Sequence, residues 1–151
     1  MRLRRSATDV FALNEENVCQ IAEGPTDCMM FDLEDGIPLT MKAEARKQTV
    51  KLFSSTDFHG KERVIRINSV DTEHYRKDMD EVVAVAVPDS IRLPKCETPK
   101  NVLIVDRDLA EIEERLGMDR NSIEIWAMVE SPLGIRNAYE IGRSYGNLCA
   151  G

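Results

Sequence analysis

Closely spaced cysteines are missing from this sequence. Its four cysteines lie far apart and form no Cys-x-x-Cys motif: Cys19, Cys28, Cys96 and Cys149. This spacing argues against a zinc site and against a disulfide framework, and it is typical of reduced, buried thiols in a cytosolic enzyme.

Long hydrophobic runs are missing as well. No apolar run approaches the roughly 20 residues that a membrane span requires. The basic residues at positions 2, 4 and 5 precede a polar segment instead of the apolar core of a secretion signal. We therefore expect a cytoplasmic protein without a membrane partner.

Positive charge is not in excess. The chain has 27 acidic against 20 basic residues, a formal net charge of −7. Such a balance argues against a nucleic-acid partner, because binding to phosphates depends on clustered lysine and arginine. With 42% hydrophobic and 31% charged residues, the composition is that of a globular protein, and we expect a single domain over residues 1–151.

Hydrophobic periodicity predicts that strands and helices alternate. Short apolar runs predict strands at residues 10–13, 28–31, 64–68, 90–93 and 123–129. Longer patterned segments predict helices at residues 15–22, 42–53, 71–83, 99–116 and 132–145. Residues 83–87 fit either a helix end or a strand. The alternation predicts an α/β fold with a parallel sheet and right-handed crossovers.

Charged side chains lie where these strands end. Arg66 is near the end of one strand, with Asn68 two positions on and on the same face. Lys95 and Glu130 follow two later strands. Since ligands collect at the carboxyl ends of parallel strands, these side chains are candidates for a binding site.

An acidic segment follows the strand at residues 28–31. Its members are Asp32, Glu34 and Asp35. They hold a metal through water, or they orient Arg66 and Lys95 from behind the site, or they form an acidic turn that caps the next helix. Lys95 either supports a substrate or simply pairs with Glu34 or Asp35.

Residue chemistry indicates a reaction for this site. Cleavage of a carbon–carbon bond beside a carbonyl leaves an enolate, which a divalent ion and a nearby cation stabilise. Glu130 suits a Mg²⁺ ligand, because Mg²⁺ needs only one or two carboxylates besides water and substrate oxygens. Arg66 suits a bidentate clamp on a substrate carboxylate.

Several segments occur in the order of one known family. They are residues 3–6, 30–35, 64–68, 93–98 and 130–135, together with Lys42, Ala45 and Arg46. Over nearly its whole length the chain resembles the HpcH/HpaI aldolase/citrate lyase family, which includes the citrate lyase β subunit.

The resemblance implies a (β/α)₈ TIM-barrel fold and a Mg²⁺-dependent lyase that converts a citryl thioester into oxaloacetate and an acetyl thioester. It implies that Arg66 binds substrate and that Glu130 binds Mg²⁺ and substrate. Implied partners are an acyl-carrier or coenzyme A thioester, other citrate lyase subunits and further copies of the chain. A malyl- or citramalyl-thioester lyase is the related alternative.

Length limits this expectation. A complete barrel takes about 250 residues, whereas this chain has 151, so we expect only its first five to six β/α units. The family's second metal-binding aspartate follows the next strand, and the chain ends at residues 148–151, where that segment should begin. A truncated, non-catalytic barrel fragment or partner-binding domain is therefore the alternative to an active lyase subunit.

Overall fold

The computed structural model describes residues 4–144, in which five parallel strands form one sheet. The strands are β1 (Ala7–Val10), β2 (Cys28–Asp32), β3 (Glu62–Arg66), β4 (Ser90–Leu93) and β5 (Glu124–Ala127). They lie side by side in sequence order, and each neighbouring pair is parallel. This order is that of a β/α barrel; a doubly wound sheet reverses its order at a switch point. The predicted barrel-type α/β fold is confirmed.

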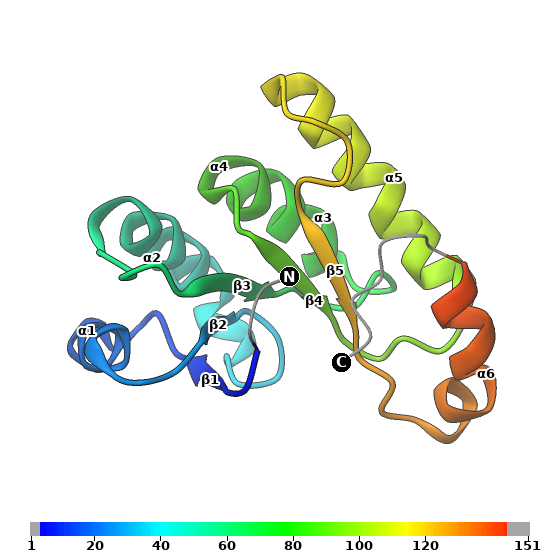
Figure 1. Cartoon of the computed structure of the whole chain (residues 1–151), viewed down its shortest axis with the longest axis horizontal. Coiled ribbons are helices and arrows are strands. Elements are labelled where there is room, and N and C mark those ends of the chain that lie inside the picture. Colours follow the sequence, from blue (N-terminus) through cyan, green and yellow to red (C-terminus); the bar gives the residue numbers. More distant parts are fainter. Residues whose placement is uncertain (1–3, 145–151) are drawn as a thin grey trace.

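Helical segments connect the strands and form an arc around the outside of the sheet (Figure 1). They are α1 (Glu15–Glu23), η1 (Leu39–Met41), α2 (Lys42–Ser55), α3 (Glu73–Asp78), η2 (Met79–Val83), α4 (Ala84–Ala86), α5 (Pro99–Leu116) and α6 (Pro132–Arg143). None of the helices within residues 4–144 combines the length and the apolar character needed to cross a membrane.

Local signals explain where these helices begin and end. Before α1 the Asn14 side chain accepts a hydrogen bond from the Asn17 N–H (3.1 Å), and before α6 the Ser131 hydroxyl accepts one from the Gly134 N–H (3.1 Å). Helix α5 has a proline in its first turn and stops at Gly117, whose φ of 67° favours glycine. The sequence therefore specifies these boundaries locally.

The outer face of the sheet forms one side of the hydrophobic core. One row across four strands is fully buried: Phe31, Ile65, Ile91 and Ile125. Phe31 packs edge-on against Phe53 of α2 at a centroid distance of 4.9 Å. Burial of this apolar row against the helices stabilises the fold.

The inner face of the sheet is polar by comparison. The next row in register consists of Asp32, Arg66, Arg92 and Trp126. Because successive side chains in a strand point to opposite faces, this row faces the barrel interior when the apolar row faces the helices.

Two sequence predictions change in detail. The strand expected at residues 10–13 is wrong, because β1 ends at Val10 and residues 11–13 turn so that the Asn14 N–H reaches the Phe11 carbonyl (3.0 Å). Residues 83–87 complete a helix and form no strand; they end at Val87, with a φ of 48°.

Candidate functional site

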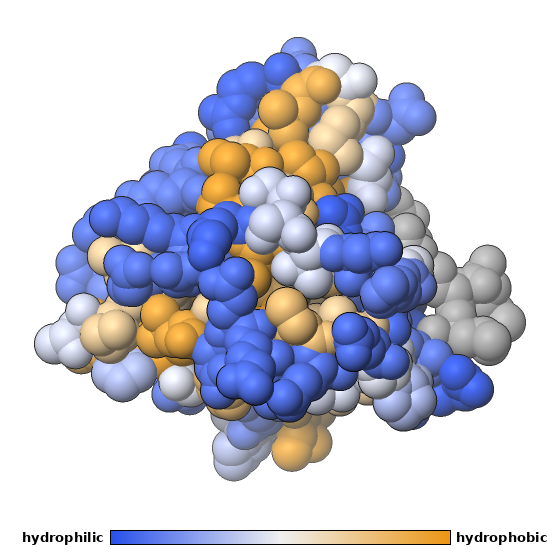
Figure 2. Space-filling view, turned by 90° about the vertical axis from the view of Figure 1, so that its left-hand side faces the viewer, coloured by the Kyte–Doolittle hydropathy of each residue, from blue (hydrophilic) through white to orange (hydrophobic). Residues whose placement is uncertain are grey.

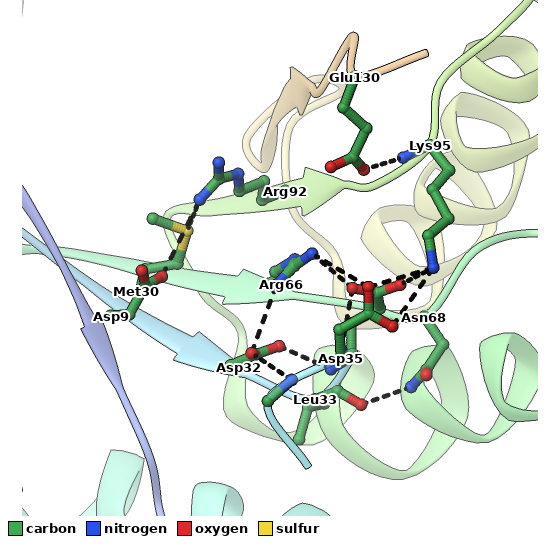
Figure 3. A network of polar contacts seen from close by, with 12 residues as sticks. Asp9, Met30, Asp32, Leu33, Asp35, Arg66, Asn68, Arg92, Lys95 and Glu130 are labelled. Carbon is green, nitrogen blue, oxygen red and sulfur yellow. Dashed lines mark hydrogen bonds and ion pairs between the residues drawn. The ribbon is translucent and has the colours of Figure 1, made fainter. Parts of the chain in front are cut away.

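The candidate site lies at the carboxyl ends of β2 to β5. Arg66 is the last residue of β3, Lys95 follows β4 and Glu130 follows β5. Figure 3 shows their side chains at one edge of the sheet, beside the acidic turn after β2. The expected convergence of Arg66, Lys95 and Glu130 at one rim is what the structure shows.

Arg66 is held by the acidic turn. Its Nη1 lies 3.4 Å from Oδ2 of Asp32, and its Nη2 lies 2.5 Å from Oε2 of Glu34. Both carboxylates are buried, and the Arg66 side chain is only 14% exposed. The two carboxylates balance the charge of the guanidinium and restrict its orientation.

Asp32 also shapes the turn itself. Its Oδ1 accepts a hydrogen bond from the Glu34 N–H (2.7 Å) and its Oδ2 accepts one from the Gly36 N–H (3.0 Å). A side chain at Gly36 would collide with the Asp32 carboxylate. Asp32 therefore organises the turn and orients Arg66. It does not cap the next helix, because neither η1 nor α2 begins with a side-chain cap hydrogen bond.

Lys95 connects three parts of the site. Its ammonium lies 2.6 Å from Oε1 of Glu34 and 3.3 Å from Oδ1 of Asp35, and its main-chain N–H donates to Oε1 of Glu130 (2.7 Å). Its φ is 51°, an uncommon value for a residue other than glycine. The expected pairing of Lys95 with Glu34 or Asp35 is present with both.

The electrostatic interactions around Lys95 favour the charged forms of Lys95 and Asp35. The hydrogen bond to Glu34 raises the pKa of Lys95 above its usual value, despite partial burial. Partial burial opposes ionisation of Asp35, but hydrogen bonds with Lys95 and Glu34 leave the pKa of this carboxyl below its usual value. The ammonium and the acidic turn therefore stabilise each other as ions.

Glu130 has free coordinating capacity. It is exposed, and within residues 4–144 its carboxylate accepts a hydrogen bond only from Lys95. Because Mg²⁺ binds few protein carboxylates and retains water, this donor set fits a sparse Mg²⁺ site with Glu130 as ligand. The described part of the chain contains no group of three or more metal-binding side chains. Residues 148–151, near which the sequence placed a second ligand, lie outside the described residues.

A buried network supports the site from behind. The Lys42 ammonium donates to the carbonyls of Leu33 and Glu34 (both 2.6 Å) and to Oδ1 of Asn68 (2.9 Å). Burial lowers the pKa of Lys42. The prediction that Asn68 shares a strand face with Arg66 is wrong, because β3 ends at Arg66 and Asn68 turns into this network.

The network ends in a buried ion pair. Asp78 accepts hydrogen bonds from Arg46 Nε (2.7 Å) and from the Asn68 N–H (2.7 Å) and Nδ2 (2.6 Å). Lys42 and Arg46 lie one helical turn apart, so one face of α2 delivers both cations to the network. No role was predicted for these two residues from the sequence. Charged side chains at buried positions of a helix were the signal that could have indicated one.

The three cysteines that the structure describes take no part in the site. Within the described residues Cys19, Cys28 and Cys96 are free, and Cys19 is exposed, contrary to the expectation of buried thiols. Burial raises the pKa of both Cys28 and Cys96 to about 11, with Glu62 adding to the effect at Cys28. Such thiols are poor nucleophiles at neutral pH. Cys149 lies outside the described residues.

Comparison with known proteins agrees with this architecture. The model of the HpcH/HpaI aldolase/citrate lyase family matches residues 11–150. The citrate lyase subunit beta of Escherichia coli K12 is 34% identical over 143 residues, which cover 95% of this chain and 47% of the relative. The human mitochondrial citramalyl-CoA lyase is 32% identical over 100 residues, covering 66% of this chain and 29% of the relative.

A solved structure shows the same fold. The citrate lyase beta subunit from M. tuberculosis, complexed with oxaloacetate and magnesium, superposes with a TM-score of 0.69 at 24% identity, covering 95% of this chain and 56% of the other. The chain spans about half the length of the curated relatives it matches. On its sequence match and its fold, the chain belongs to the HpcH/HpaI aldolase/citrate lyase family.

Proposed function

We propose that this chain carries the substrate clamp and a metal ligand of a Mg²⁺-dependent carbon–carbon lyase, which cleaves a citryl thioester into oxaloacetate and an acetyl thioester. The observation that carries the proposal is the convergence of Arg66, Lys95 and Glu130 at the carboxyl ends of three adjacent strands. Similarity to citrate lyase beta subunits over 95% of the chain supports the choice of substrate.

The reaction moves one proton and one electron pair. The bond between the hydroxyl-bearing carbon and the methylene beside the thioester carbonyl breaks. The hydroxyl loses its proton and becomes the ketone of oxaloacetate. The bonding electrons remain on the methylene carbon as the enolate of the acetyl thioester, which then takes up a proton.

The residues of the chain serve this reaction by binding and orientation. Arg66 would hold a substrate carboxylate, and Asp32 and Glu34 keep its guanidinium in place. Glu130 would hold Mg²⁺ through the carboxylate oxygen that the Lys95 N–H leaves free. The chemistry that Mg²⁺ supplies when bound is positive charge beside the developing negative charge on oxygen.

Partners follow from the same proposal. The substrate would be an acyl-carrier or coenzyme A thioester, and the chain would assemble with other citrate lyase subunits and with copies of itself in the cytoplasm. The designation of the E. coli relative as a subunit supports an assembly.

A malyl- or citramalyl-thioester lyase is the second candidate. The human citramalyl-CoA lyase at 32% identity and a (3S)-malyl-CoA thioesterase of Cereibacter sphaeroides at 32% identity over 129 residues favour it. Arg66 and Glu130 would have the same roles there, because those thioesters also carry a hydroxyl and a free carboxylate.

Turnover and ligand binding test the proposal together. The purified chain with Mg²⁺ would be given citryl-coenzyme A, and oxaloacetate release would be followed by its reduction with NADH and malate dehydrogenase. Oxaloacetate binding would be titrated in parallel, since a partner-dependent subunit binds without turning over. Glu130→Gln and Arg66→Lys should each weaken whichever signal the parent shows by about tenfold or more, and Arg76→Lys on the exposed side of α3 is the control. Absence of both signals would contradict the proposal.

A further inference from the structure

Arg92 is the least neutralised guanidinium on the inner face of the sheet. It lies beside Arg66 in the register of β3 and β4, so the two α-carbons are separated by about one strand spacing, ~4.8 Å. Arg66 has two close carboxylates. Within residues 4–144 the only carboxylate near Arg92 is that of Asp9, at 4.0 Å.

The other contact of Arg92 is weak. Its Nη1 lies 2.9 Å from the Met30 thioether (Figure 3), and sulfur is a poor acceptor for a cation. The Arg92 side chain is 24% exposed, while that of Asp9 is 59% exposed and therefore well solvated. A guanidinium has five N–H donors, so most of those on Arg92 have no protein acceptor in the described part of the chain.

Two further donors in the same row lack acceptors. Arg66 Nε and Trp126 Nε1 are buried and have no hydrogen-bond partner among the described residues. Arg66, Arg92 and Trp126 occupy matching positions on β3, β4 and β5. Buried polar groups are nearly always paired in native proteins, so the two buried donors of Arg66 and Trp126, in one row with the unfilled donors of Arg92, indicate a missing acceptor.

Asp32 cannot supply that acceptor. It is the fourth member of the row, but its two oxygens already accept hydrogen bonds from the N–H groups of Glu34 and Gly36 and contact Arg66. The row therefore contains two guanidinium groups, an indole N–H and one carboxylate, and both oxygens of that carboxylate already accept hydrogen bonds. An anion with several acceptor oxygens would fill these positions, and a carboxylate has the required charge and shape.

We infer that Arg92, together with the indole N–H of Trp126, forms a second carboxylate-binding subsite beside Arg66, and that this subsite selects a dicarboxylate over a monocarboxylate. The inference rests on the proposed function, since it specifies the substrate class of the same site. A citryl thioester carries two free carboxylates and yields a dicarboxylate. Malyl and citramalyl thioesters carry one and yield monocarboxylates. Arg66 would bind the carboxylate common to all of them, and Arg92 the second one.

A matched pair of ligands tests the subsite. Oxaloacetate and pyruvate differ by one carboxylate, and both would be titrated into the full chain with Mg²⁺. Trp126 is the sole tryptophan of the sequence, so its fluorescence reports on the subsite directly, and calorimetry gives the affinities. We expect oxaloacetate to bind at least about tenfold more tightly than pyruvate, as for a charge-assisted hydrogen bond.

Two variants separate the subsite from the rest of the site. Arg92→Met retains an apolar stem beside Met30 and removes the charge; it should weaken oxaloacetate binding about tenfold or more and leave pyruvate binding unchanged. Trp126→Phe retains an aromatic ring and removes the N–H. Calorimetry should show a smaller loss of affinity than for Arg92→Met, and for oxaloacetate only. Arg76→Met, which removes an exposed guanidinium on α3, is the matched control.

The outcomes distinguish the inference from the proposed function. Equal affinities for the two ligands, or a parallel loss of both in Arg92→Met, would overturn the subsite and leave the lyase proposal intact. Binding of neither ligand by the parent chain would contradict the proposed function and the subsite together. If Arg92→Met fails to fold, Arg92→Lys and Trp126→Phe make the same comparison, because each retains most of the parent side chain.

Discussion

The main-chain N–H of Lys95 donates to Oε1 of Glu130 at 2.7 Å, while the ammonium of the same residue lies 2.6 Å from Glu34. Lys95 thereby links the ends of β2, β4 and β5. Its contact to Glu130 uses the backbone, and its contact to the acidic turn uses the side chain. Substitution of the Lys95 side chain should therefore disturb the acidic turn and leave the orientation of Glu130 largely intact.

Lys95→Met should raise the pKa of Asp35 towards its ordinary value of 3.8, because the hydrogen bond that lowers it is lost. A carboxyl with a lowered pKa stabilises the fold above its unfolded-state pKa, and that contribution disappears as the pH falls through the folded-state value. An NMR titration of the side-chain carboxyl carbons measures the change. Asp27, held at a pKa of about 2 by Arg5, is the internal control and should not move. An unchanged Asp35 would show that Lys95 does not set its pKa.

Glu130→Gln should weaken Mg²⁺ binding by about tenfold or more, since the amide lacks the charge that a hard divalent cation prefers. Calorimetric titration of Mg²⁺ into the purified chain measures the loss. We expect binding by the parent to be weak, because Glu130 is the only metal ligand assigned within residues 4–144. Glu140→Gln, on exposed α6, should bind like the parent. Tight one-to-one binding that survives Glu130→Gln would show that another residue is the ligand.

Arg66→Lys should weaken oxaloacetate binding by about tenfold or more, because an ammonium cannot reproduce the planar fork that binds a carboxylate through two parallel hydrogen bonds. Calorimetry in the presence of Mg²⁺ gives the affinity. Circular dichroism should show an unchanged fold, because lysine retains a positive charge near Asp32 and Glu34. Equal affinity in parent and variant would remove Arg66 from the substrate clamp.

Asp78→Ala should lower the free energy of unfolding by roughly 3–5 kcal/mol, because it leaves Arg46 buried without its partner. Asp78 is fully buried and Arg46 is 4% exposed at the side chain. Asp80→Ala is the matched control two residues on, since its pair with Arg76 is 47% and 59% exposed and should contribute at most about 1 kcal/mol. Urea unfolding measures both. Similar losses for the two variants would contradict the role given to the buried pair.

The chain should sediment as a species larger than its 17.1 kDa mass at low micromolar concentration. Among the described residues β1 and β5 are the outermost strands of the sheet, and unpaired strand edges promote association. Large apolar side chains are also exposed: Leu39 at 74%, Ile135 at 67% and Tyr139 at 71%. Figure 2 shows hydrophobic surface gathered among hydrophilic areas on one face of the molecule. A stable monomer under dilute conditions would contradict the expected self-association.

Much of the fold could be predicted because it depends on neighbours in sequence. The helix at residues 99–116 was predicted with the bounds that α5 has, since a proline, a buried stripe and a glycine with positive φ all lie within it or next to it. The order of strands and helices follows equally from local periodicity. The boundary error at β1 arose because its four residues alternate in burial only weakly.

Placement of the candidate site was also predictable, since side chains at the ends of parallel strands share one edge by geometry. Arg66, Lys95 and Glu130 meet for this reason. The role of Asn68 was not predictable, because its partners Lys42 and Asp78 come from other segments.

Only the tertiary structure decided which charges are neutralised and which are not. Arg66 and Arg92 are both inward-facing arginines on neighbouring strands, and nothing in their local sequence distinguishes them. The turn after β2 places Asp32 and Glu34 against Arg66, whereas no such turn within residues 4–144 approaches Arg92. Periodicity determines the face on which a side chain lies, because it depends on the backbone repeat. The electrostatic environment depends on contacts between residues far apart in the sequence, so it is set by the folded chain.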